Sequence, residues 1–109
     1  MAFAAKQSSV NTIISVENPR LDAALAPAFR TYLTEQIAEG TNHIVLDMSQ
    51  VEFVDSSGLG VLVSMVKQLS GVGEIKLANP GKAVLEMLRL TRMDNVFDIY
   101  TSVDEADAA

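Results

Sequence analysis

The stretch VEFVDSSGLGVLV, residues 51–63, decides how this chain folds. A short loop carries Val51, Phe53 and Val54 to the polar turn DSSG, and an apolar run continues from Leu59. This order indicates a loop after a strand that leads directly into a helix packed against a sheet. The first backbone N–H groups of such a helix have no partner within the helix, so the turn favours an oxygen atom or an anion.

The segments on either side of this turn alternate between strand-like and helix-like patterns. The continuous apolar run at residues 44–46 suits a strand covered on both faces. Apolar residues four apart, from Leu25 to Ile37, predict a helix that ends at Gly40. We predict strands at residues 2–7, 12–16, 43–48, 74–78 and 96–100, and helices at residues 25–39, 57–70 and 82–91. The acidic tail is either a short helix capped by Ser102 or a frayed end.

This alternation of helices and buried strands predicts an α/β fold. We expect a mixed, mostly parallel sheet of about four to five strands, with three to four helices packed on it and right-handed crossovers. The length of 109 residues suits a single domain, 1–109.

The second helix carries two apolar residues whose role stays open. Its inner side is predicted to hold Leu59, Leu62, Val63, Val66 and Leu69. Val61 and Met65 lie four apart and off that stripe, so they either join the core, the commoner case, or form an apolar contact patch beside Ser56 that is edged by Ser64.

The composition narrows the possible functions. A net charge of −6, from 8 basic and 14 acidic residues, disfavours nucleic acid and anionic membrane surfaces as partners. The sequence has no Cys, which excludes disulfides and thiolate metal sites. Residues 1–10 do not resemble a secretory signal, and no apolar run is long enough to span a membrane, so we expect a cytoplasmic protein. No pattern indicates a cofactor or a metal.

The DSSG turn has two interpretations. In the first it only caps a helix, with Ser57 or Ser56 as the N-cap and Asp55 beside it. In the second, Ser56 accepts a phosphoryl group, which adds about −1.5 to −2 charge and repels a docked partner without unfolding the domain. Gly58-x-Gly60 is not a nucleotide loop, because a third Gly and a following Lys-Ser/Thr are missing.

A hydrolase that uses Ser56 as its nucleophile would need a general base. His43 is the only His, and it starts a strand whose opposite end leads toward Ser56. A Ser-His-Asp site is therefore not expected, and we predict that the chain is not an enzyme.

The stretch at residues 51–63 resembles the signature of the STAS domain, named for sulfate transporters and anti-sigma factor antagonists. RLDA at residues 20–23 resembles the family's entry to its first helix, and HIVLD at residues 43–47 resembles its central strand. Residues 77–106 resemble its C-terminal third. The resemblance covers about residues 10–106, which we take as the core of the domain. Two departures are Asn18-Pro19-Arg20 ahead of the Leu-Asp pair, and Arg92-Met93 where the family often has Gly-Leu.

The resemblance implies a partner-switching protein. The unphosphorylated antagonist binds an anti-sigma factor that is also a serine kinase. The kinase then phosphorylates Ser56 and is released, and a metal-dependent serine phosphatase resets the switch. Ser57 is assigned to helix capping, and Asp55 to placing the Ser56 hydroxyl, with Gly58 as further support. The expected partner-binding residues are Asp22, Ser56, Leu59, Gly60, Val61, Ser64 and Met65.

The resemblance also leaves an alternative, a STAS scaffold or regulatory module that acts on a transporter or a signalling complex. The chain length and the intact Ser56-Ser57 pair favour the antagonist, which we expect to be a monomer.

Overall fold

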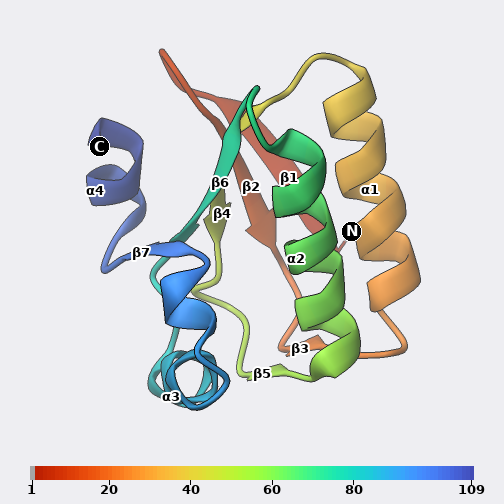
Figure 1. The fold of residues 1–109 in the computed structure, drawn as a ribbon, viewed down its shortest axis with the longest axis vertical. Coiled ribbons are helices and arrows are strands. Elements are labelled where there is room, and N and C mark those ends of the chain that lie inside the picture. Colours follow the sequence, from red (N-terminus) through yellow and green to blue (C-terminus); the bar gives the residue numbers. More distant parts are fainter. Residues whose placement is uncertain (1) are drawn as a thin grey trace.

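The computed structural model describes residues 2–109 and shows an α/β fold with helices on both faces of a sheet (Figure 1). The elements in chain order are β1 (Phe3–Gln7), β2 (Thr12–Val16), β3 (Arg20–Leu21), α1 (Ala26–Ala38), β4 (His43–Asp47), β5 (Phe53–Val54), α2 (Ser56–Leu69), β6 (Glu74–Ala78), α3 (Lys82–Leu90), the short 3-10 helix η1 (Met93–Asn95), β7 (Asp98–Tyr100) and α4 (Val103–Ala108).

The main sheet has five strands in the order β1-β2-β4-β6-β7. β1 pairs antiparallel with β2, and the other neighbours are parallel. This confirms the predicted mixed, mostly parallel sheet. β3 and β5 form a separate two-stranded parallel pair.

The carboxyl ends of the parallel strands lie at one end of the sheet, and the candidate site is at that end. In Figure 1, β4 runs down to this end, β5 follows, and α2 starts there and runs back up beside α1. The face under α1 and α2 holds the main core, in which Phe29, Leu46 and Leu77 are fully buried. α4 covers the other face, where Ala106 packs with Ile13 and Val45.

The packing of α2 differs from the predicted stripe. Val61 and Met65 are each only 2% exposed and lie in the core, whereas Leu59, Val63 and Val66 are half-buried. The helix is rotated toward the 58–61–65 side because it packs against α1 as well as the sheet. This confirms the commoner of the two interpretations, in which Val61 and Met65 join the core, and it leaves neither side chain available for a contact patch beside Ser56.

The C-terminal region follows the prediction with shorter elements. Arg92 adopts a left-handed conformation with φ of 60° between α3 and η1, at the position where the family often has Gly. η1 and the turn after it occupy residues 93–97, so β7 begins at Asp98 rather than at Val96. Ser102 caps the short terminal helix, which confirms the helical interpretation of the tail. No helix within residues 2–109 is both long enough and apolar enough to cross a bilayer.

Candidate functional site

Two short parallel strands with the same sequence pattern form the candidate site. Arg20-Leu21 of β3 pairs with Phe53-Val54 of β5, and an Asp follows each pair. Leu21 and Val54 point into the core, where they are 0% and 6% exposed. This register brings the two carboxylates, Asp22 and Asp55, to the starts of neighbouring helices.

Asp55 is the N-cap of α2. Its Oδ1 accepts the N–H groups of Ser57 at 2.8 Å and Gly58 at 3.1 Å. Its Oδ2 accepts the N–H of Ala23 at 3.1 Å, and its own N–H donates to the Leu21 carbonyl at 3.2 Å. The carboxylate therefore fixes the start of α2 and ties it to the loop before α1, instead of contacting the Ser56 hydroxyl.

Ser56 is the first residue of α2, and its side chain is exposed to solvent. Among residues 2–109, neither its hydroxyl nor its N–H has a hydrogen-bond partner. Ser57 is also exposed, and its assignment as the cap is wrong, because Asp55 already occupies both N–H groups that a cap would bind. A free hydroxyl thus stands at the positive end of the helix dipole.

Gly58 lets α2 approach β3 closely. A Cβ at this position would lie 2.4 Å from the Leu21 carbonyl oxygen and 2.7 Å from the Leu21 Cγ. A side chain would therefore displace the same strand that accepts the Asp55 N–H. Position 58 therefore requires Gly because α2 and β3 pack too closely there for a side chain.

Asp22 belongs to a charged and aromatic surface beside the site. Its Oδ2 accepts the Arg20 Nε at 3.1 Å, and its Oδ1 accepts the Ala24 N–H at 3.1 Å. The Arg20 hydrogen bond is the largest cause that lowers the pKa of the Asp22 carboxyl from its usual 3.8. The Arg20 guanidinium also lies 4.3 Å from the centroid of the Phe53 ring, which is 40% exposed. We call Arg20 and Phe53 the cation–π pair.

Sequence reasoning missed the cation–π pair. The signal was available, because Arg20 and Phe53 each stand two residues before an Asp that ends a short strand. Residues two apart on a strand point to the same face, so this spacing places both side chains on the side of the carboxylates.

The other expected partner-binding residues are only partly accessible. Gly60 is exposed, while Leu59 and Ser64 are half-buried. The Ser64 hydroxyl accepts a hydrogen bond from Arg30 Nη1 at 3.1 Å, which links α2 to α1. A groove of about 480 Å³ between these helices is lined in part by Arg30 and Ser57.

The structure keeps His43 away from Ser56. His43 starts β4 at the end of the sheet opposite the start of α2 (Figure 1), and its Nδ1 pairs with the Glu74 carboxylate. No three His, Asp or Glu side chains in residues 2–109 lie together as metal ligands would. His43 is therefore not placed to act as a base for Ser56.

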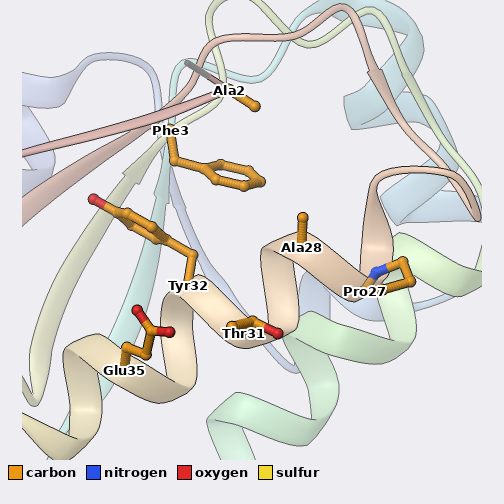
Figure 2. A pocket seen from close by; sticks show the side chains of 7 residues that line it. All are labelled: Ala2, Phe3, Pro27, Ala28, Thr31, Tyr32 and Glu35. Atoms are coloured by element: carbon orange, nitrogen blue, oxygen red, sulfur yellow. The ribbon is translucent and has the colours of Figure 1, made fainter.

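An apolar pocket of about 470 Å³ lies on the other side of α1 from the site. Figure 2 shows the Phe3 and Tyr32 rings facing each other there, with the Glu35 carboxylate beside them. Burial and the nearby Glu39 charge raise the pKa of the Tyr32 hydroxyl. The pocket contains neither Ser56 nor either of the site's carboxylates.

The comparisons with known proteins agree with this fold. The STAS domain family model matches residues 2–106, and the chain belongs to this family. The match begins closer to the N-terminus than the resemblance at residues 10–106, and it includes β1.

The chain is similar to several bacterial regulatory proteins. It is 33% identical over 98 residues to a candidate anti-sigma factor antagonist of Thermotoga neapolitana, a match that covers 88% of this chain and 87% of the relative. The crystal structure of a candidate anti-sigma factor antagonist of Thermotoga maritima superposes with a TM-score of 0.86 at 29% identity, over 97% of this chain and 92% of the other. The Bacillus cell fate determinant SpoIIAA, in its phosphorylated form, shares the fold with a TM-score of 0.74 at 21% identity, over 98% and 97% of the two chains.

Proposed function

We propose that this chain is an anti-sigma factor antagonist that binds an anti-sigma factor serine kinase and is released when Ser56 is phosphorylated. The observation that carries the proposal is the exposed Ser56 hydroxyl, free of hydrogen bonds within residues 2–109, at the first turn of a helix that a different residue caps. The similarity to antagonists of Thermotoga supports the choice of partner class.

The local structure suits a phosphate without rearrangement. The Asp55 carboxylate takes the N–H groups of Ser57 and Gly58, so the helix start does not depend on the Ser56 side chain. The Ser56 N–H has no partner among residues 2–109 and is available to a phosphate oxygen. The helix dipole further favours an anion here.

The same phosphate would repel a docked partner. It adds about −1.5 to −2 charge beside Asp22 and Asp55, on a chain whose net charge is already −6. The docking surface of the unphosphorylated form includes the apolar edge at Leu59 and Gly60 and the neighbouring cation–π pair. A dianion at its centre turns this surface from attractive to repulsive.

A kinase assay tests the site. The chain is incubated with ATP and each anti-sigma-type serine kinase of its source organism, and its peptides are analysed by mass spectrometry. We expect one phosphate on Ser56, none in Ser56→Ala, and an unchanged yield in the matched control Ser57→Ala. Phosphate on another residue, with Ser56 unmodified, would overturn the assignment.

A binding assay tests the switch. Ser56→Ala should bind the kinase but resist release by ATP. Ser56→Asp should weaken binding by about tenfold, or ~1.4 kcal/mol, which is a partial effect because the mimic carries one charge. Equal affinities of Ser56→Asp and the unmodified chain, measured by calorimetry, would contradict the electrostatic mechanism.

The remaining parts of the proposal follow from this role. A metal-dependent serine phosphatase would reset the switch, and the protein would act as a monomer in the cytoplasm without enzymatic activity of its own. A regulatory STAS module of a transporter or signalling complex would use the same fold, and the similarity to the Thermotoga relative favours the antagonist.

A further inference from the structure

A groove of about 620 Å³ follows β7 along the edge of the sheet that is not paired with β6. Five consecutive residues, Phe97 to Thr101, line it, and three of them form β7. Successive side chains of a strand point to opposite faces, so a groove that touches consecutive residues runs along the strand's edge. α3 and η1 supply the opposite wall, and Asn79 and Pro80, which follow β6, also line the groove. We call this cavity the β7 edge groove.

The β7 edge groove exposes backbone hydrogen-bonding groups. The Tyr100 carbonyl accepts the Asn79 N–H at 2.9 Å, so the peptide groups of Tyr100 face β6. The groups of successive residues alternate between the two sides of a strand, and those of Ile99 therefore face the groove. Among residues 2–109, the N–H and carbonyl of Ile99 have no hydrogen-bond partner there.

The charges of the β7 edge groove favour a basic occupant. Its walls carry the carboxylates of Asp94 and Asp98, both exposed, against the single guanidinium of Arg89. The whole chain adds a net charge of −6. A Lys or Arg side chain that enters the groove is therefore attracted both locally and at a distance.

We propose that the β7 edge groove binds an extended segment of a partner protein, which adds a strand to β7 and places a basic side chain between Asp94 and Asp98. Strand addition supplies affinity through the main chain of Ile99, and the carboxylates supply the preference for a basic residue. The groove shares no residue with the Ser56 site, so the inference does not depend on the proposed function. The pocket in Figure 2 differs, because it meets the other edge strand only at Ala2 and Phe3 and is otherwise lined by α1.

A peptide titration followed by NMR on the full chain tests this inference. The probes are acetyl-Val-Lys-Val-Lys-Val-amide, its Glu counterpart, and the Lys peptide with N-methylated backbone amides. We expect the Lys peptide to shift the amide signals of Ile99 and Thr101, and to bind at least about fivefold more tightly than the Glu peptide. Raising the salt from about 50 to about 500 mM should weaken this preference. N-methylation should abolish binding.

Variants of the strand give a second line of evidence. Ile99→Pro removes the N–H that faces the groove and none that pairs with β6, so the sheet tolerates it better than a Pro in a central strand. It should lose the Lys peptide, while the control Ile99→Val keeps it. Thermal unfolding verifies that each variant is folded. If Ile99→Pro does not fold, the binding of the N-methylated Lys peptide to the unmodified chain tests whether main-chain pairing is needed. Equal binding of the Lys and Glu peptides, no shift at Ile99, or shifts confined to residues around Ser56 would overturn the proposal.

Discussion

Within residues 2–109, two helices begin with a side-chain cap, and they use serine in opposite ways. In α4, Ser102 is the cap, and its hydroxyl accepts the Glu105 N–H at 3.1 Å. In α2, Asp55 is the cap, and the following Ser56 keeps a free hydroxyl in solvent. A serine that caps a helix is committed to structure, whereas a serine one place later is available for chemistry. The position relative to the cap therefore distinguishes a candidate modification site from a structural serine.

The two helices are also held by different forces. α2 is long, and it buries Val61, Leu62 and Met65 in the main core. α4 has six residues, and polar contacts hold much of it. The Asp107 carboxylate accepts Ser8 Oγ at 2.6 Å and Asn11 Nδ2 at 2.9 Å, and Lys76 Nζ donates to the Ala109 oxygen at 2.9 Å. Changes to packing should therefore affect α2, and changes to polar groups should affect α4.

The largest effect is expected for Gly58→Ala, which attacks the packing of the α2 start. The new Cβ would meet the Leu21 carbonyl oxygen at 2.4 Å, so β3 or α2 must move. We expect a loss of about 3 kcal/mol in the free energy of unfolding, measured in urea, because backbone cannot yield as a side-chain tip does. Phosphorylation of Ser56 should slow as the cap geometry is lost.

Gly60→Ala is the matched control on the same helix. A Cβ at Gly60 has nothing within 4 Å, and Gly60 is exposed. This variant should gain about 0.5–1 kcal/mol, since Ala is the better helix former. If both variants are destabilised alike, the close contact with Leu21 is not what requires Gly58.

Removal of the caps compares the two helix starts directly. Asp55→Ala leaves the N–H groups of Ser57 and Gly58 without their acceptor and should cost about 1–2 kcal/mol. Ser102→Ala should cost about 0.5–1 kcal/mol and act locally, because α4 is short. Urea unfolding measures the first, and hydrogen exchange at Ala106 the second. A larger global loss from Ser102→Ala than from Asp55→Ala would reverse the comparison.

Most of the fold could be predicted because its signals are local. Periodicity marks the strands and helices, and Gly and Pro mark their ends, as at Gly40 and at residues 79–81. The face of α2 that is buried could not be predicted from periodicity. Its apolar residues cover more than one face, and only the contact of Gly58 with Leu21 and the packing on α1 decide which face is deepest.

Local signals likewise predict one part of the candidate site, and long-range contacts decide the rest. The motif alone indicates a helix start at residues 55–57, and the exposure of Ser56 agrees with that. Which residue caps the helix depends on which oxygen reaches the N–H groups, and here the carboxylate of Asp55 does so instead of the hydroxyl of Ser57. The spacing of Arg20 and Phe53 from the two Asp residues is a local signal, but the meeting of the two side chains depends on the pairing of residues 20 and 53, which is a long-range contact.

The smallest effect concerns the polar anchor of α4, and it depends on pH. Hydrogen bonds from Ser8 and Asn11, with the Lys76 charge, lower the pKa of the Asp107 carboxyl below its usual 3.8. A carboxyl whose pKa is lower in the folded state contributes stability above its unfolded pKa and loses it as the pH falls through the folded pKa. The amides of α4 should therefore lose protection from hydrogen exchange below about pH 4, before those of α2.

Asp107→Asn separates this effect from general acid unfolding. The amide side chain keeps an oxygen for Ser8 and Asn11 but does not titrate, so the ratio of α4 to α2 protection should stay flat across the same pH range. In the unmodified chain that ratio should fall with acid, because α2 is held by apolar packing that does not depend on the Asp107 charge. If the ratio falls equally in Asp107→Asn, other groups control the release of α4. The contrast between a helix held by packing and a helix held by polar contacts would then fail.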